Sequence, residues 1–295
     1  MIAQTAFLER LFDHLWNEYK DRVSYARAYE DVLKERGGTF YNDHLAFRTF
    51  ATQDKWSGIS AIARPFEALG YRPAGAYDFP DKNLTSLHFA PPSENLPKLF
   101  VSELRVWELS PRARKVALAA AAKAAPGLTD AELAQLSDLP TIPARVREKL
   151  LRRWAAQFGR RWPAPKAAEA LALEKESQFG AWVLLHGHTV NHFTAAVHSH
   201  GVEELDDIEK TVAALKKAGV PMKPDIEGDP GSKLRQSSTQ AVVIPVEMRA
   251  GARVVKKPWT YAYFEIAERP LLDGKRFEGF LGGQATNLFE MTRRS

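Results

Sequence analysis

Residues 42–48 read NDHLAFR and residues 190–194 read VNHFT, and the two stretches look like copies of one motif. His44 and His192 occupy the same place in the two copies. A glycine follows each histidine 26 or 27 residues later, and each half then reaches a glutamate in a strand-like run: Gly70 and Glu103, then Gly219 and Glu265. A histidine, a helix, strands and a glutamate, repeated, predict a duplicated module that gathers metal ligands from distant parts of the chain.

Composition limits the kinds of site that the chain can build. The 295 residues suffice for one large domain or two modest ones, and the apolar fraction of 45% and the charged fraction of 26% are ordinary for a globular protein. The sequence has no cysteine, which excludes disulfides, thiolate metal sites and a cysteine nucleophile. A metal must therefore bind to His, Asp or Glu, a set that suits iron, manganese or zinc.

The net charge of +5 comes from one segment. Between Arg112 and Arg161 the chain has 11 Lys or Arg residues and only 4 Asp or Glu residues. We interpret this segment as a solvated helical face and expect no nucleic-acid partner, because no RNA-binding motif, zinc finger or Gly-rich phosphate loop accompanies it. The N-terminus lacks a basic region followed by an apolar core, and no apolar run approaches a membrane span. We therefore expect a cytoplasmic protein without membrane contact.

The order of periodic and turn-rich segments predicts an α+β fold. We expect an N-terminal helical segment at 1–38, a first βαβββ module at 39–109, a helical insertion at 110–178 and a second βαβββ module at 179–295. The second module should end in a closing helix after Gly282 and Gly283. The modules should form one compact unit, with a curved sheet or barrel around a metal.

The expected elements follow from the spacing of apolar residues. Helices are predicted at 6–34, 55–69 and 202–218. Strands are predicted at 39–50, 71–77, 84–89, 99–108, 180–197, 240–246 and 258–266.

The repeated histidines and one glutamate make a plausible set of metal ligands. Strand alternation places His44, Ala46 and Arg48 on one face of the first strand. His192 would repeat the position of His44, and Glu265 would add a carboxylate from the last strand of the second module. Two histidines and one carboxylate leave coordination positions open and are the usual set for non-haem Fe(II) oxygen chemistry.

Two other histidines compete with this set. His186 and His188 would share a strand face with His192 and could act as ligands in its place. We favour His192 because only this histidine repeats the environment of His44.

Two other glutamates also need to be weighed. Glu268 is a rival of Glu265, but it lies closer to a turn. Glu103 is the expected counterpart of Glu265 in the first module. It is either a vestigial fourth ligand or a carboxylate paired with Arg105 or Arg48, and we leave it out of the metal site.

The repeated pattern of strands, His, His and Glu resembles the vicinal oxygen chelate superfamily. The C-terminal part is similar to hydroxyphenylpyruvate dioxygenases in three stretches: LRQSST at 234–239, FEIAER at 264–269 and GFLGGQ at 279–284. Over most of the chain, the resemblance is closer to the 2-oxoadipate dioxygenase/decarboxylase family, also called hydroxyglutarate synthases. Three stretches carry it: NDHLAFRT at 42–49, PKLFVSEL at 97–104 and NHFT at 191–194.

The resemblance implies a reaction and roles for five residues. Fe(II) would bind to His44, His192 and Glu265, and Arg48, as the catalytic residue, would hold a substrate carboxylate. Gln236 would match a substrate-contacting glutamine of the hydroxyphenylpyruvate enzymes. The implied reaction decarboxylates a 2-oxo acid with O2, so that 2-oxoadipate would give 2-hydroxyglutarate and CO2 with both oxygen atoms incorporated.

Two other functions stay open. A glyoxalase- or isomerase-like enzyme of the same superfamily would favour Glu103 as a fourth ligand and consume no oxygen. A metal-free binding module of the same fold would leave His44, His192 and Glu265 far apart or without a metal. The sequence sets neither the oligomeric state, nor the substrate's chain length, nor the physiological metal.

Overall fold

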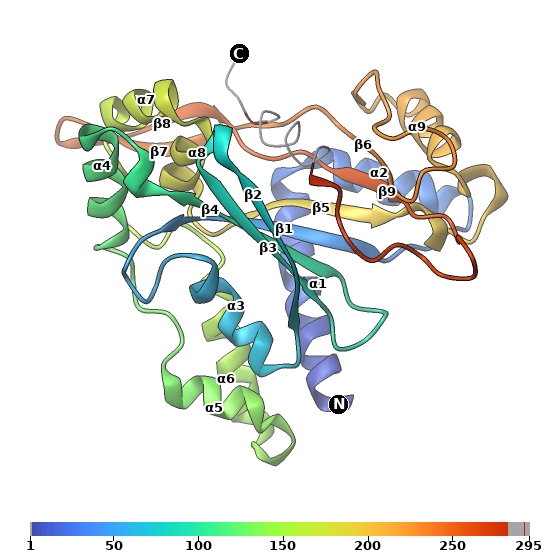
Figure 1. The fold of residues 1–295 in the computed structure, drawn as a ribbon, viewed down its shortest axis with the longest axis horizontal. Coiled ribbons are helices and arrows are strands. Elements are labelled where there is room, and N and C mark those ends of the chain that lie inside the picture. Colours follow the sequence, from blue (N-terminus) through green and yellow to red (C-terminus); the bar gives the residue numbers. More distant parts are fainter. Residues whose placement is uncertain (1, 283–291, 293–295) are drawn as a thin grey trace.

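The computed structural model describes residues 2–282 and Thr292. The helices are α1 (Ile2–Arg22), α2 (Ser24–Glu35), α3 (Ile59–Ala68), α4 (Pro111–Ala121), α5 (Asp130–Ser137), α6 (Ala144–Ala155), α7 (Ala167–Glu176), α8 (Gln178–His186) and α9 (Ile208–Lys217) (Figure 1). The strands are β1 (Asn42–Ala51), β2 (Arg72–Phe79), β3 (Leu84–Ala90), β4 (Lys98–Arg105), β5 (Val190–Ala196), β6 (Arg235–Ser238), β7 (Val243–Ala250), β8 (Arg253–Thr260) and β9 (Glu265–Glu268). The closing helix expected after Gly282 and Gly283 lies outside the described residues.

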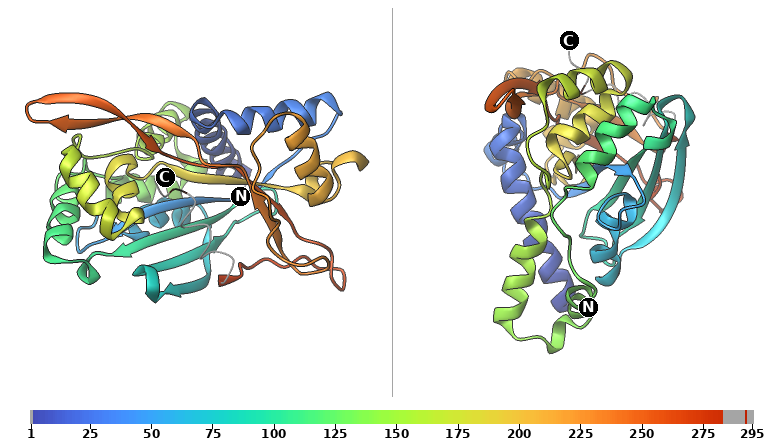
Figure 2. Two further views of the ribbon diagram at one scale, coloured as in Figure 1. Left: turned by 90° about the horizontal axis from the view of Figure 1, so that it is seen from above. Right: turned by 90° about the vertical axis from the view of Figure 1, so that its left-hand side faces the viewer.

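One curved sheet joins the two halves of the chain. Its seven strands have the order β2-β3-β4-β1-β5-β9-β6. The central strands β1 and β5 are antiparallel to each other, and each has a parallel neighbour from its own half, β4 beside β1 and β9 beside β5. The views in Figure 2 show the curl of the sheet, with α1 and α6 side by side along one side of it. The predicted α+β fold with a curved sheet built from two modules is confirmed.

The second module contains an irregular strand and an inserted hairpin. Residues 222–227 take the place of an outer strand, because Met222 pairs with Thr239 and Glu227 with Gln236 in isolated bridges. Strands β7 and β8 pair only with each other, as a separate two-stranded sheet within the described residues. The strand predicted at 240–246 overlaps the hairpin only from residue 243. The strand predicted at 258–266 is divided, because 258–260 end β8 and 265–266 begin β9. Most side chains of the hairpin are too exposed for the centre of a sheet.

The two central strands each contain a β-bulge where they pair. Asp43 is the extra residue in β1, and Asn191 is the extra residue in β5. The register around them is Asn42 with Ala195, His44 with Thr194, Ala46 with His192, and Phe47 with Val190. A bulge re-aims the neighbouring side chains. Here it allows each extra residue to lie beside the histidine that follows it.

The two faces of the sheet have different coverings. On one face, Phe193 of β5 packs against Trp16 of α1, with ring centroids 5.1 Å apart. On the other face, His44, Ala46 and Arg48 line a pocket, as the alternation along β1 predicted. The sheet thus has its helical support behind it and a cavity in front.

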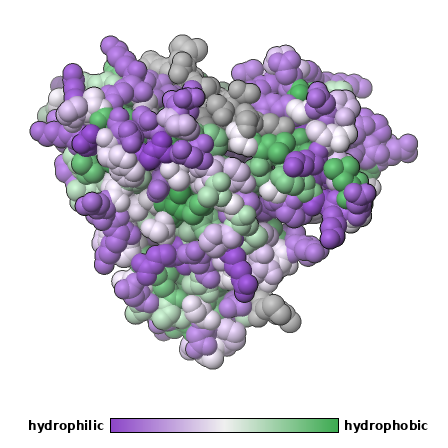
Figure 3. Space-filling model, in the orientation of Figure 1, coloured by the Kyte–Doolittle hydropathy of each residue, from purple (hydrophilic) through white to green (hydrophobic). Residues whose placement is uncertain are grey.

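The surface in Figure 3 is mainly hydrophilic, as expected for a protein whose apolar core lies inside the molecule. Hydrophilic side chains cover most of this face, with smaller hydrophobic patches between them.

Helices α4 to α7 lie within the basic stretch and its C-terminal flank. Among the described residues, no helix is both long and apolar enough to cross a membrane. The division at residues 38, 109 and 178 stays a prediction.

Two of the predicted elements were wrong. The helix expected at 6–34 is two helices that break at Val23, where no glycine or proline signals an end. The strand expected at 180–197 begins instead as α8, and only 190–196 is a strand. All of α8 is buried, so its apolar residues show no period that could distinguish helix from strand. The hydroxyl of Ser177, which accepts from the Gly180 N–H, caps its N-terminus.

Gly187 turns the chain from α8 into β5 and so positions the strand that carries His192. Its φ is +67°, and a Cβ there would lie 2.4 Å from the Arg160 Cα and from the Gly159 carbonyl oxygen. Gly201 has a similar φ of +71°, but nothing lies within 4 Å of the place of its Cβ. A side chain at residue 201 would therefore meet backbone strain alone, whereas one at residue 187 would meet backbone strain and a steric clash.

We therefore expect Gly187→Ala to be much more destabilising than Gly201→Ala. A positive φ costs an alanine about 1–2 kcal/mol or more, and overpacking against the backbone adds about 1–3 kcal/mol more at residue 187. Urea unfolding of the two variants measures the difference. Equal losses of stability would contradict the packing of the α8–β5 turn on Gly159 and Arg160.

Candidate active site

Three buried side chains converge from the central strands. His44 lies on β1, His192 on β5 and Glu265 at the start of β9. The Oε2 atom of Glu265 is 3.6 Å from Nε2 of His44 and 3.7 Å from Nε2 of His192. Candidate ligand atoms of the three groups all lie within 4.8 Å of one another. The β1–β5 pairing and the β5–β9 pairing together produce this cluster.

The donor set fits a metal ion. Two ligand atoms that are each about 2.1 Å from an ion, at right angles to each other, lie about 3 Å apart, so a small contraction would suffice. The Oε1 atom of Glu265 is fully buried and accepts no hydrogen bond from the described residues. Such a buried, unpaired carboxylate oxygen is explained if a cation binds there. The metal-free alternative allowed these three groups to lie far apart, and this expectation is wrong.

Each histidine is held at its other ring nitrogen by the residue before it. Nδ1 of His44 is 2.8 Å from a carboxylate oxygen of Asp43, and Nδ1 of His192 is 3.0 Å from the amide oxygen of Asn191. This contact fixes the ring and places the proton on Nδ1, which leaves Nε2 to bind a metal. The bulges at Asp43 and Asn191 make both contacts possible.

The two histidines differ in their proton affinity. Burial lowers the pKa of His192 to about 4, although the nearby Glu265 raises it. Burial also acts to lower the pKa of His44, but the hydrogen bond to Asp43 and the nearby carboxylate of Glu265 outweigh it, and the pKa is raised. His192 is therefore neutral near pH 7, the form that binds a metal.

Arg269 connects the carboxylate of Asp43 to a loop over the pocket. The guanidinium donates to both oxygens of Asp43, at 2.6 and 2.9 Å, and to the carbonyl oxygens of Phe277 and Gly279. Burial acts to raise the pKa of Asp43. Arg269 and His44 act in the opposite direction and outweigh burial, so the pKa of Asp43 lies well below its usual value. The loop places the Phe280 ring 4.8 Å from the His44 ring.

Arg48 lies in the same pocket, further along β1. Its guanidinium lies over the rings of Phe179 and Trp182, at 5.0 and 5.2 Å from their centroids, and it donates to the Thr292 hydroxyl at 2.9 Å. The Thr292 hydroxyl also accepts from Gln178. Stacking of this kind orients the plane of the guanidinium.

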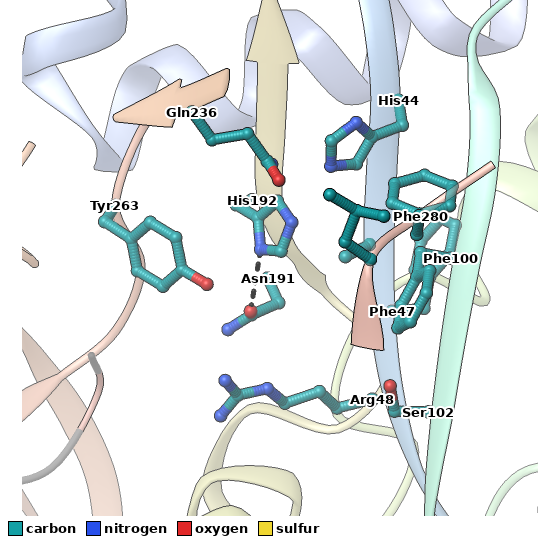
Figure 4. A pocket seen from close by; sticks show the side chains of 12 residues that line it. His44, Phe47, Arg48, Phe100, Ser102, Asn191, His192, Gln236, Tyr263 and Phe280 are labelled. Carbon is teal, nitrogen blue, oxygen red and sulfur yellow. Dashed lines mark hydrogen bonds between the residues drawn. The ribbon is translucent and has the colours of Figure 1, made fainter. Parts of the chain in front are cut away.

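The pocket lining is partly apolar and partly polar, and Phe47, Phe100 and Phe280 lie together in it (Figure 4). The apolar lining consists of Ala46, Phe47, Phe100, Phe280 and Leu281. The polar lining consists of His44, Arg48, Ser102, Asn191, His192, Gln236 and Tyr263. Gln236 lines the same pocket as Arg48, and Tyr263 stacks on His192 with ring centroids 5.1 Å apart.

The rival histidines lie outside this pocket. His186 is the last residue of α8, and its Nε2 is 3.2 Å from the Thr260 carbonyl oxygen. Nε2 of His188 is 3.0 Å from the Thr49 hydroxyl. The strand face that we expected them to share with His192 does not exist, because α8 and the turn at Gly187 precede β5.

The rival glutamates also have other partners. Glu268 pairs with Arg235 at 3.1 Å. Glu103 accepts from the first N–H of α3, on Ile59, at 2.8 Å, and so faces the helix. A fourth metal ligand at Glu103, as the glyoxalase-like alternative favoured, does not agree with this position.

The sheet register corrects the counterpart of Glu265. Thr194 pairs with Glu265 two residues after His192, and Ala46 pairs with Phe100 two residues after His44. The residue equivalent to Glu265 in the first module is therefore Phe100, not Glu103. The first module contributes an aromatic side chain at the position where the second contributes a carboxylate.

Sequence reasoning missed Asp43, Asn191, Tyr263 and Arg269 as residues of the site. One signal was present for the first two, because an Asp or Asn precedes the repeated histidine in both copies. Strand alternation would have placed them on the opposite face, and only the bulges reverse this.

Comparison with known proteins agrees with this geometry. Residues 4–290 match the family model for 2-oxoadipate dioxygenase/decarboxylase. The chloroplastic 2-oxoadipate dioxygenase/decarboxylase of Arabidopsis thaliana is 31% identical over 279 residues, which are 85% of this chain and 67% of that protein.

Two crystal structures show the same fold. The hydroxyglutarate synthase from Oryza sativa, in complex with 2-oxoadipate, is 25% identical with a TM-score of 0.78, over 99% of this chain and 93% of that one. A protein from Ralstonia eutropha JMP134, described as a glyoxalase superfamily member, is 25% identical with a TM-score of 0.84, over 94% of this chain and 86% of that one. The expected vicinal oxygen chelate fold is confirmed. With a match over nearly its whole length and this shared fold, the chain belongs to the 2-oxoadipate dioxygenase/decarboxylase family.

Proposed function

We propose that this protein is an Fe(II)-dependent dioxygenase that decarboxylates a 2-oxo acid, with 2-oxoadipate as substrate and 2-hydroxyglutarate and CO2 as products. The observation that carries the proposal is the convergence of His44, His192 and Glu265 in one buried pocket with Arg48. The family name and the 2-oxoadipate complex of the rice relative support the substrate. The reaction consumes one O2, and both oxygen atoms enter the five-carbon product.

The three ligands have the chemistry that this reaction needs. When bound, Fe(II) supplies open coordination positions for the 2-oxo acid and O2 and stabilises the charge that develops as oxygen is reduced. Asp43 and Asn191 hold protons on the Nδ1 atoms, so that the two Nε2 atoms would bind the ion. Phe100 and Phe280 form an apolar wall beside His44 that keeps water from the reacting carbon.

The surroundings of Arg48 support its proposed role in binding a substrate carboxylate. It is 2% exposed, and Phe179 and Trp182 hold its guanidinium plane. A guanidinium can donate two parallel hydrogen bonds to a carboxylate, which a lysine cannot.

The Arabidopsis relative is named as a chloroplast protein, and the cytoplasmic location of this chain stays a prediction.

We expect the protein, loaded with Fe(II), to take up O2 and release CO2 when 2-oxoadipate is added, and to form 2-hydroxyglutarate in equal amount. An oxygen electrode and product analysis by mass spectrometry measure this. If the protein acts only on another 2-oxo acid, the assigned substrate is wrong but the oxidative decarboxylation stands. Absence of oxygen uptake with every 2-oxo acid would sink the proposal.

The metal ligands can be tested by metal content. After loading with Fe(II) under argon, His44→Gln, His192→Gln and Glu265→Gln should retain little metal, because each removes one ligand from a site of three. Glu103→Gln is the matched control for Glu265→Gln, and His188→Gln is the control for His192→Gln. Thermal unfolding checks that each variant is folded. Metal retained by His192→Gln but lost from His188→Gln would show that the wrong histidine was chosen.

Arg48→Lys keeps the positive charge but loses the paired hydrogen bonds. We expect KM for the 2-oxo acid to rise about 10- to 100-fold, since a hydrogen bond to a charged group contributes about 1.5–3 kcal/mol. Metal content should not change. The exposed Arg72→Lys on β2 is the matched control. An unchanged KM in Arg48→Lys would remove Arg48 from the substrate site.

A further inference from the structure

Two buried amide groups in the pocket have hydrogen-bond donors without a partner among the described residues. Nδ2 of Asn191 and Nε2 of Gln236 are fully buried, and neither donates to any atom of the described residues. The whole Asn191 side chain is only 1% exposed. Leaving a buried donor unpaired costs about 1–3 kcal/mol, so each of these groups calls for an explanation.

The orientation of the Asn191 amide follows from its contact with His192. If Nε2 of His192 binds a metal, Nδ1 carries the proton, and only the amide oxygen of Asn191 can accept it. The NH2 group is then turned away from the ring. In Figure 4 it lies on the side of the amide that faces Arg48, in the pocket that Asn191, Arg48 and Tyr263 line together.

The corresponding residue in the first module makes a different arrangement. Asp43 is also a bulged residue beside a histidine, but a carboxylate has no donor. Both of its oxygens bind the buried Arg269. The first module thus uses its bulged side chain to hold a histidine and a loop, whereas Asn191 holds a histidine and presents an N–H group to the cavity.

We propose that Asn191 is a substrate-binding residue, whose Nδ2 donates a hydrogen bond to an oxygen of the bound 2-oxo acid while its Oδ1 holds His192. The inference rests on the proposed function. It deepens that function, because one amide then links the orientation of a metal ligand to the position of the substrate. An anionic oxygen placed between Asn191 and Arg48 would receive hydrogen bonds from both.

Asn191→Asp removes the donor that this proposal assigns to the substrate. The variant has nearly the same shape and keeps an acceptor for Nδ1 of His192, but it loses the N–H group and adds a negative charge. We expect the Kd for 2-oxoadipate, measured by calorimetry on Fe(II)-loaded protein under argon, to rise at least about tenfold. KM should rise in parallel, and the metal content should stay at the unmodified level. Asn95→Asp makes the same chemical change on an exposed loop and should leave Kd unaltered.

The outcomes separate the two proposals. If the unmodified protein binds and turns over a 2-oxo acid, and Asn191→Asp binds the same acid equally well, the inference fails while the function stands. Loss of metal from Asn191→Asp would also overturn it, since the amide would then serve only to hold His192. If the unmodified protein binds no 2-oxo acid, the function fails and the inference fails with it.

Discussion

The antiparallel pairing of β1 with β5 is the constraint on which the rest of the structure depends. It places Thr194 opposite His44 and Ala46 opposite His192, so that histidines from distant parts of the chain face one cavity. The parallel addition of β9 to β5 then brings Glu265 opposite Thr194. Helix α1 supports the back of these strands through Trp16 and Phe193, and leaves the front for the site.

The charges in and around the pocket are arranged to suit a cation and an anion together. Glu265 is fully buried, which acts to raise its pKa, but the two nearby imidazoles, of His192 and His44, and the hydrogen bond from Thr194 outweigh burial and lower it. The second buried carboxylate, Asp43, is matched by Arg269 and does not face the cavity. Arg48 adds a positive charge at the other end of the pocket. Buried charges are stable only with such partners, so this arrangement agrees with the proposed binding of a divalent ion and a carboxylate substrate.

Equivalent positions in the two modules carry different side chains with different roles. Equivalent positions hold Glu265 in the second module and Phe100 in the first, which gives one carboxylate ligand and one aromatic wall. The bulged residues differ in the same way, since Asp43 holds a loop through Arg269 and Asn191 faces the cavity. The loop in turn places Phe280 over His44. If the proposed function holds, His44, His192 and Glu265 would form the ligand side of the centre, and the aromatic wall would face the substrate chain.

The sequence by itself determined the repeated motif, the α+β class, the absence of thiol chemistry, and the choice of His44, His192 and Glu265, because repetition and strand alternation are local patterns. It misplaced α8 as a strand, since a segment that is buried on all sides has no period. Only the tertiary structure decided that Glu103 caps α3 and that Phe100 is the counterpart of Glu265, because sheet register depends on pairing between strands. The same holds for Asp43 and Asn191: two bulges, which no single strand encodes, turn them toward the histidines.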